Sequence, residues 1–288
     1  DGTPKGAIIA IMEIWGVNDT MREHAKEFAE AGFVCLVPDL FWRQEPGVEL
    51  SDKNASDIEK AFDLYYDFDY DLGVLDMQDT MTYLKALPEC NGKVGSVGYC
   101  LGGKLCYLMC CRTEIDCAVA YYGTYIEHRI KEAPNLHRPF LLHMAMKDRW
   151  VQAEVNDLLI RKLSPNPLVT IEQYPGADHA FARHGGRTYS KPEADRALTL
   201  SIDFFKKYLF NLKLGFLILD HISQISFFIY NYFIIFINLF TSLFLNPIKI
   251  RAIFIIFFNI LFCLIYDIWI FIISSIYYIT FNIFIKYW

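Results

Sequence analysis

The chain has 288 residues, a formal net charge of −6 and an isoelectric point near 5.7. A chain of this length can bury a sizeable core, which excludes a disordered or fibrous protein. Its acidic balance offers no bulk attraction to polyanions, so we expect no nucleic-acid partner.

Apolar runs and amphipathic segments alternate along most of the chain. An apolar run over residues 7–12 predicts a buried strand, a helix begins near Asn18 and ends at Gly32, and a second apolar run covers residues 33–38. Such a unit connects parallel strands through a right-handed crossover. The alternation predicts an α/β fold with a mostly parallel sheet, helices on both faces, and a site at the carboxyl ends of the strands. Further strands are expected at 93–98, 118–122, 140–146 and 168–174, and helices at 54–66, 73–87, 101 onward, 152–163 and 192–211.

The segment 98–102 reads Gly-Tyr-Cys-Leu-Gly and joins a predicted strand to a predicted helix. This is the Gly-x-Ser-x-Gly nucleophile elbow with cysteine in the serine position. The glycines let strand and helix approach closely, and the N–H groups at the helix start favour a thiolate and a developing oxyanion. The pattern indicates a nucleophilic Cys100, and the alternative is a glycine-rich turn around a buried cysteine.

Two more candidate residues follow predicted strands further along the chain. Asp148 comes after the run over 140–146, and His179 comes after the run over 168–174. The chain order of nucleophile, acid and histidine is typical of α/β-hydrolases. His179 suits proton transfer near neutral pH, and a carboxylate behind it would orient the imidazole. We therefore predict a triad of Cys100, Asp148 and His179, although a lone loop histidine is often only solvent-facing.

Six segments together resemble the dienelactone hydrolases (carboxymethylenebutenolidases), from about residue 7 to about residue 208. They are MEIWGVND, VPDLFWRQEPG, NGKVGSVGYCLGG, AVAYYG, KDRWV and GADHAFAR. The resemblance implies an α/β-hydrolase fold, with a catalytic domain at residues 1–211. It also implies hydrolysis of a small lactone or ester through an acyl-enzyme, and we expect neither a metal nor a cofactor.

The resemblance assigns roles to further residues. The glutamate that matches Glu13 contacts the resting thiol in the family, and backbone N–H groups at the positions of Leu101 and Ile14 form the oxyanion hole. Arg183 matches an arginine that binds the substrate carboxylate, a task that suits the guanidinium fork. An exposed, solvated arginine is the alternative reading of Arg183.

One departure from the family concerns substrate charge. The second carboxylate-binding arginine of the family falls on Ile58 in this chain, which weakens the case for dienelactone itself and allows a less anionic lactone or ester. Phe62 and Tyr65 share the helical face of Ile58. Trp15, Tyr122 and Trp150 are candidate walls of an apolar pocket, although aromatic residues in such runs are often only core.

The residues from 212 to 288 form an apolar tail that we expect to lie outside the fold. Its stretches 225–245 and 252–266 are long and apolar enough to suggest a two-helix membrane hairpin. The tail has no valine, however, and no glycine after position 215. We interpret it as translated non-coding sequence, with a membrane anchor as the alternative.

The spacing of the cysteines indicates the cellular compartment of the protein. The eight cysteines form no CxxC pair, which favours reduced thiols and a cytoplasmic protein. The chain begins at Asp1 without the pattern of a signal peptide, and we interpret this start as truncated or processed. The leading hypothesis is a cytoplasmic cysteine hydrolase that acts on a small lactone or ester. The alternatives are a non-catalytic binding protein with the same fold and a hydrolase anchored in a membrane through residues 225–266.

Overall fold

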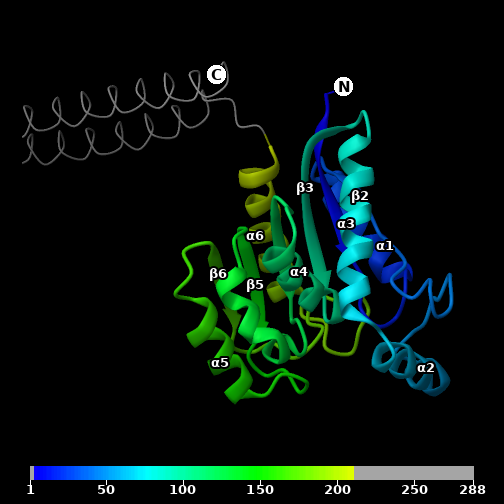
Figure 1. Cartoon of the computed structure of the whole chain (residues 1–288). Helices are drawn as coiled ribbons and strands as arrows, with labels where there is room; N and C mark the ends of the chain where they lie inside the picture. Colours follow the sequence, from blue (N-terminus) through cyan, green and yellow to red (C-terminus); the bar gives the residue numbers. More distant parts are fainter. Residues whose placement is uncertain (1–2, 211–288) are drawn as a thin grey trace, which may run out of the picture. The chain divides into compact units, whose positions relative to one another are not determined.

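A parallel sheet forms the centre of the described part of the chain (Figure 1). The computed structural model describes residues 3–210, so the tail at 212–288 and the anchor hypothesis for 225–266 lie outside the described residues. The six strands stand in the order β2-β1-β3-β4-β5-β6, and every neighbouring pair is parallel. This confirms the predicted α/β architecture. The strands are β1 (Lys5–Ile11), β2 (Val34–Leu36), β3 (Cys90–Tyr99), β4 (Cys117–Tyr121), β5 (Phe140–Ala145) and β6 (Val169–Tyr174).

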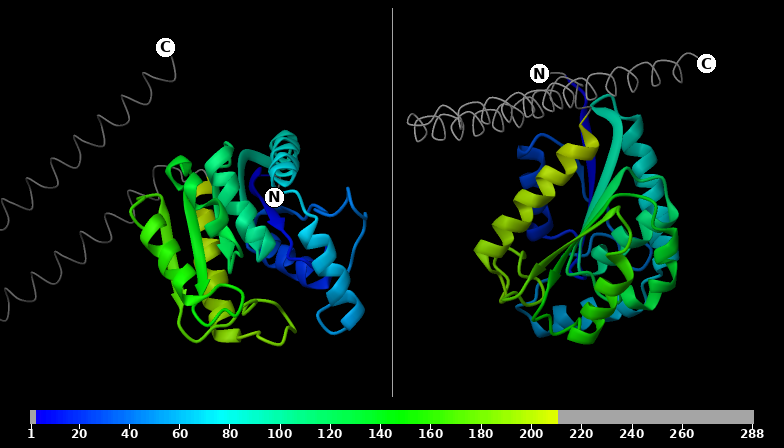
Figure 2. Two further views of the ribbon diagram at one scale, coloured as in Figure 1. Left: turned by 60° about the horizontal axis from the view of Figure 1, so that its bottom comes forward. Right: turned by 90° about the vertical axis from the view of Figure 1, so that its left-hand side faces the viewer.

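Helices cover both faces of the sheet, as the crossover rule requires (Figure 2). The helices α1 and α6 lie on one face, while α3, α4 and α5 lie on the other. The helix α2 lies apart from both layers, near the carboxyl ends of the strands (Figure 1). The helices are α1 (Asp19–Glu30), α2 (Ala55–Tyr66), α3 (Tyr70–Ala86), α4 (Leu101–Arg112), the 3-10 helix η1 (Ile126–Asn135), α5 (Ala153–Leu163) and α6 (Lys191–Leu209).

Side-chain caps set the beginnings of two helices. The Asn18 carboxamide accepts a hydrogen bond from the backbone N–H of Met21 and caps α1, as the sequence predicts. The Asp69 carboxylate accepts hydrogen bonds from the N–H groups of Asp71 and Leu72. The helix α3 therefore begins at Tyr70, three residues before the predicted start. The helix η1, a 3-10 segment that contains Pro134, is not among the predicted elements.

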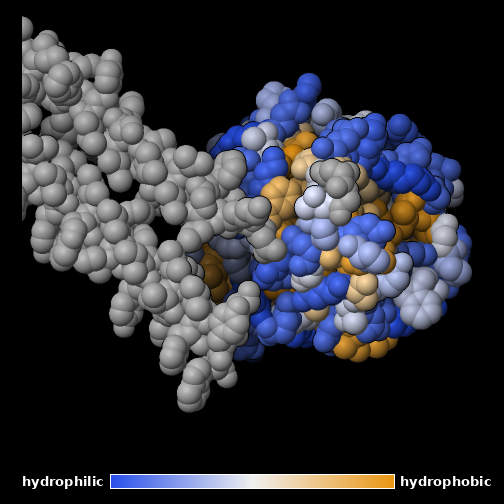
Figure 3. All heavy atoms as spheres, turned by 90° about the horizontal axis from the view of Figure 1, so that it is seen from above, coloured by the Kyte–Doolittle hydropathy of each residue, from blue (hydrophilic) through white to orange (hydrophobic). Residues whose placement is uncertain are grey.

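The core lies between the sheet and its two helical layers. Every residue of β4 and β5 is buried, as are residues 6–11 of β1. On the α6 side, a Cβ at Gly95 would lie 2.9 Å from the ring of Phe205, so this helix packs directly on β3. The view from the amino ends of the strands shows mostly hydrophilic residues, with apolar ones in small separate areas (Figure 3). Within residues 3–210, no helix has the length and apolar character needed to cross a bilayer.

Candidate active site

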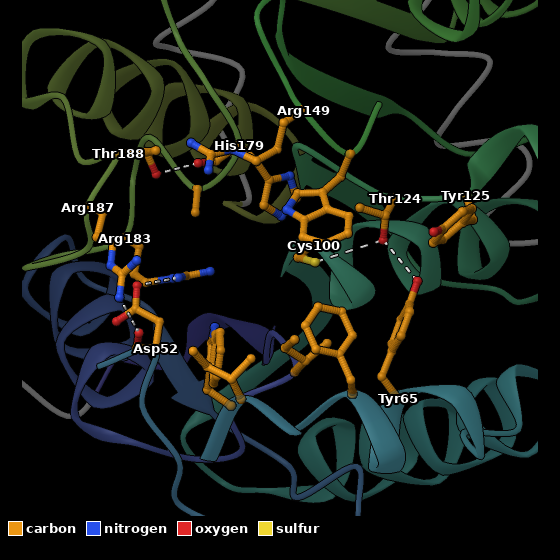
Figure 4. Close-up of a pocket in the computed structure, with 16 residues that line it drawn as sticks. Asp52, Tyr65, Cys100, Thr124, Tyr125, Arg149, His179, Arg183, Arg187 and Thr188 are labelled. Carbon is orange, nitrogen blue, oxygen red and sulfur yellow. Dashed lines mark hydrogen bonds and ion pairs between the residues drawn. The ribbon is translucent and has the colours of Figure 1, made fainter. Parts of the chain in front are cut away.

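A cavity of about 290 Å³ opens beside the carboxyl ends of the strands (Figure 4). Cys100 reaches it from the junction of β3 and α4, and His179 reaches it from the loop after β6. The helix α2 supplies the opposite wall with Ile58, Phe62 and Tyr65. Because parallel strands all end at the same edge, the strand order brings residues far apart in the sequence to one cavity.

Cys100 occupies a strained turn at the start of α4. Its φ is +53°, a left-handed conformation that non-glycine residues adopt only where the surrounding structure imposes it. A Cβ at Gly98 would lie 2.1 Å from the carbonyl oxygen of Gly102, and one at Gly102 would lie 2.4 Å from that of Ile11. Both glycines are therefore required by backbone contact. The side chain of Cys100 consequently points from the strand end into the cavity.

Backbone strain in the described residues gathers around this cavity. The non-glycine residues with positive φ are Cys100, Tyr122, Tyr125 and Ala180, and all but Tyr122 line the cavity. Tyr122 lies directly behind His179, with ring centroids 5.0 Å apart. Strained conformations are concentrated at functional sites, where they aim side chains that relaxed backbone would turn elsewhere. Their position here supports a functional role for the cavity.

His179 is held by the carboxylate of Asp148. The Nδ1 atom of His179 lies 2.8 Å from Oδ2 of Asp148, and both side chains are buried. The other carboxylate oxygen of Asp148 accepts hydrogen bonds from the N–H groups of Trp150 and Val151, at 2.7 and 3.2 Å. Burial lowers the pKa of His179, but the negative charge of a Cys100 thiolate and the hydrogen bond to Asp148 outweigh it and raise the pKa to about 10. The imidazole is thus oriented by a fixed carboxylate and favours its protonated form beside the sulfur.

A buried ion-pair group lies at the other end of the cavity. The Nε of Arg183 donates to Oε2 of Glu13 at 2.6 Å, and one terminal nitrogen donates to Asp52 at 3.1 Å. Burial lowers the pKa of Arg183, but the negative charge of Glu13 and its hydrogen bond outweigh this and raise the pKa above its usual value. The resemblance places Glu13 on the resting thiol, but the structure places it on Arg183. Its Oε1 is buried and has no hydrogen-bond partner among the described residues.

The two backbone groups expected to bind an oxyanion are free. Within residues 3–210, neither the N–H of Leu101 nor that of Ile14 has an acceptor. Leu101 is the first residue of α4, where backbone N–H groups have no partner inside the helix. Ile14 lines the cavity itself. Both positions can therefore donate to a bound group.

Most of the predicted wall residues lie where the sequence suggests. Phe62 and Trp150 both line the cavity and contact each other, with ring centroids 5.6 Å apart. Tyr65 and Trp15 also line it, whereas the buried ring of Tyr122 does not. Ile58 lines the cavity where the resemblance calls for an arginine, so this wall is apolar.

Several residues of the cavity were not singled out from the sequence. They are Asp52, Thr124, Tyr125, Arg149, Ala180, Arg187 and Thr188. Thr124 lies three residues after the end of β4, so the rule on carboxyl ends would have pointed to it. Asp52 and Arg187 lie on long loops, and no local pattern indicates that they meet the same cavity.

One cluster in the described residues has the composition of a metal site. The ring nitrogens of His24 and His184 and the carboxylate of Glu27 lie within 4.8 Å of one another. Each oxygen of Glu27 is already bonded to one ring, at 3.1 Å for His24 and 2.9 Å for His184. None of the three lines the cavity of Cys100. The cluster is thus a closed hydrogen-bond network that connects α1 to the loop after β6.

The sheet order, the strained elbow and the histidine–aspartate pair together define an α/β-hydrolase fold. The dienelactone hydrolase family model matches residues 1–209, and the chain belongs to that family. It is 38% identical over 192 residues to carboxymethylenebutenolidase 1 of Cupriavidus pinatubonensis, covering 67% of this chain and 80% of the relative. It is 37% identical over 201 residues to the carboxymethylenebutenolidase of Pseudomonas putida, covering 70% of this chain and 85% of the relative. A dienelactone hydrolase-like structure from Klebsiella pneumoniae superposes with a TM-score of 0.65 at 23% identity, covering 72% of this chain and 88% of that one.

Proposed function

We propose that this protein hydrolyses small lactones or esters of the dienelactone type through a cysteine nucleophile. One observation supports this more than any other: Cys100, on a strained elbow, shares a single cavity with His179, which is bonded to Asp148. The family relationship supports the reaction class, because the relatives named above are carboxymethylenebutenolidases.

In the proposed mechanism, the sulfur of Cys100 attacks the carbonyl carbon, and the carbonyl oxygen becomes an oxyanion. The free N–H groups of Leu101 and Ile14 would hold that oxygen, where they stabilise charge that develops in the transition state. His179 first takes the thiol proton and later passes a proton to the leaving oxygen, while Asp148 keeps the imidazole oriented. Water, activated by His179, then hydrolyses the thioester and restores the thiol.

The cavity indicates a small substrate with an apolar part. Its volume of about 290 Å³ lies at the lower end of the range for small-molecule sites. The aromatic rings of Phe62 and Trp150 contact each other in its wall. The cations Arg183 and Arg187 lie together at one side of it (Figure 4). Arg183 is already paired with two carboxylates. A substrate carboxylate therefore competes with Glu13 and Asp52 for it, which favours weakly acidic or neutral substrates.

Cys100→Ala tests the mechanism. Turnover of p-nitrophenyl acetate and of small unsaturated lactones is expected to fall by more than about a thousandfold, because the nucleophile is lost. The pre-steady-state burst of the native protein should disappear in the variant. Cys35→Ala is the control, since Cys35 lies on β2 and does not line the cavity. Retained turnover in Cys100→Ala would overturn the mechanism.

A non-catalytic binding protein with this fold is the alternative. It predicts binding of a lactone without release of product and without covalent labelling of Cys100. The cytoplasm remains the proposed location, because all seven cysteines of the described residues are free thiols.

A further inference from the structure

Two hydroxyl groups stand in line with the sulfur of Cys100. The Oγ1 of Thr124 lies 3.8 Å from the Sγ of Cys100, and the hydroxyl of Tyr65 lies 3.3 Å from the same Oγ1 (Figure 4). Thr124 follows β4 and Tyr65 comes from α2, so the line crosses from the sheet edge to the opposite wall. Thr124 is 3% exposed. Its backbone N–H also donates to the carbonyl of Cys100 at 3.4 Å, which fixes its position beside the elbow.

The line has a direction when Cys100 is a thiolate, because a thiolate sulfur can only accept a hydrogen bond. A threonine hydroxyl has one proton to donate and can accept a second hydrogen bond. Burial raises the pKa of Tyr65 to about 12, although its bond to Thr124 opposes this, so the phenol keeps its proton at neutral pH. When Tyr65 donates to Thr124, the single proton of Thr124 is left for the sulfur. Among the described residues, Tyr65 and Cys100 are the hydrogen-bond partners of the Thr124 hydroxyl.

We propose that the Thr124 hydroxyl donates a hydrogen bond to the sulfur of Cys100, and that Tyr65 acts as the positioning residue that orients this hydroxyl. The inference rests on the proposed function and assigns a second contact to its nucleophile. A charge-assisted hydrogen bond stabilises a thiolate more than a neutral thiol. The bond also holds the sulfur on the cavity side, where a substrate carbonyl would meet it.

Thr124 and Tyr65 have a different role from the other groups around the sulfur of Cys100. His179 comes from the loop after β6 and exchanges a proton with Cys100, whereas Thr124 keeps its own proton throughout. Four other charged or titratable groups interact electrostatically with Cys100: Arg183, Tyr122, Tyr125 and Tyr70. None of these four forms a hydrogen bond with Thr124 or Cys100 in the described residues. They stay in place when Thr124 is changed, so a substitution there isolates the hydroxyl.

Alkylation of Cys100 by iodoacetamide, followed by peptide mapping over pH 5–9, measures the effect on the sulfur without a substrate. Thr124→Val keeps the side-chain shape and removes the hydroxyl. We expect its alkylation rate near neutral pH to fall about tenfold, with the midpoint of the pH–rate profile shifted upward, because a hydrogen bond to a charged group is lost. Thr124→Ser should retain the native profile. Tyr65→Phe should give a smaller shift, and the double variant should be no worse than Thr124→Val.

Tyr125→Phe is the matched control, since Tyr125 lines the same cavity but its hydroxyl forms no hydrogen bond with Thr124 or Cys100 in the described residues. Near-ultraviolet circular dichroism checks the fold of each variant, and Thr124→Ser and Tyr65→Phe serve if Thr124→Val fails to fold. A native alkylation profile in folded Thr124→Val, or additive effects of the two single changes, would overturn the inference. Absence of ester turnover in the native protein, with these alkylation shifts intact, would instead overturn the proposed function alone.

Discussion

Arg183 and Glu13 show how two candidate site residues come to depend on each other. The side chain of Glu13 is 5% exposed and that of Arg183 is 13% exposed, and their contact of 2.6 Å neutralises two charges that would be costly to bury separately. Asp52 adds a second carboxylate at 3.1 Å. The pair therefore contributes to stability as well as to the chemistry proposed for the cavity.

Arg183→Ala is expected to lower the free energy of unfolding by about 3 kcal/mol or more, because it leaves the Glu13 carboxylate buried without a cation. Denaturant titration measures this loss. Arg149→Ala is the control, since the exposed pair of Arg149 with Asp178 is worth at most about 1 kcal/mol. Adding Glu13→Gln to Arg183→Ala should restore part of the stability. If Arg183→Ala and Arg149→Ala lower the free energy of unfolding equally, the buried pair is not stabilising.

Ile58 provides a test of substrate charge at the cavity wall. Ile58→Arg places a cation where the resemblance expects one, and should raise kcat/KM for acidic lactones about tenfold relative to neutral esters of the same size. Ile58→Gln separates the effect of charge from that of polarity. If the ratio of acidic to neutral substrate does not change in Ile58→Arg, the residue does not face the acidic group of the substrate.

At the scale of elements, the junction of β3 and α4 depends on backbone contact. The helix begins so close to β1 that a Cβ at Gly102 would lie 2.4 Å from the carbonyl oxygen of Ile11. Gly102→Ala should therefore destabilise the fold by about 2 kcal/mol or more, through forced displacement of the elbow. Gly176→Ala is the control, because its nearest neighbour would be a flexible carboxylate oxygen of Glu193 at 3.7 Å. Thermal denaturation compares the two, and equal melting temperatures would contradict the close approach.

The helix α1 is connected to the loop after β6 by a pair that depends on pH. Burial raises the pKa of Glu27, but hydrogen bonds from His184 and His24 outweigh it and lower the pKa from 4.5 to about 2. The pKa of His184 is raised above 6.5, mainly by its hydrogen bond with Glu27. The contribution of Glu27 to the free energy of unfolding is present above pH 4.5 and is lost as the pH falls towards 2. The contribution of His184 to the same free energy is complete below pH 6.5 and is lost as the pH rises through its raised pKa.

The pair therefore stabilises the fold most between about pH 4.5 and 6.5. His184→Gln should lower the melting temperature more at pH 5.5 than at pH 8.5. Buried His143, whose pKa burial lowers to about 3, affects both proteins equally and cancels in the difference. His128→Gln, at an exposed position on η1, should show no such pH dependence. A constant difference across this range would show that the charge of His184 does not contribute.

At the scale of the whole fold, the last described helix, α6, packs against the first strands of the sheet. Leu209 is fully buried, its carbonyl accepts a hydrogen bond from Asn91 at 2.9 Å, and Gly6 packs directly against it. The end of α6 thus joins the amino ends of β1 and β3. A catalytic domain at residues 1–211 remains our proposal, and these contacts support it.

A chain that ends at Asn211 should fold and hydrolyse esters with a kcat within about twofold of the full chain, because sheet, elbow and cavity precede its end. Activity and circular dichroism measure this. A chain that ends at Ser190 lacks the buried side chains of Phe205 and Leu209 and should not fold. An inactive 1–211 chain beside an active full-length chain would contradict the proposed domain boundary.

The sequence by itself determined the strands and the elbow. Continuous apolar runs predict buried parallel strands such as β4 and β5, and Gly98 and Gly102 reveal a turn that only glycine permits. Candidate nucleophile, acid and base could be identified because each follows such a run. These properties are local, since they depend on the chemistry of a few neighbouring residues.

Only the tertiary structure decided which partners these residues meet. Glu13 pairs with Arg183, 170 positions away, and Tyr65 meets Thr124, 59 positions away. Such contacts follow from strand order and from the placement of α2 over the carboxyl ends of the strands, which no local pattern specifies. The electrostatics of the cavity are collective for the same reason: burial and the nearest opposite charge set each pKa, and both exist only once the chain has folded.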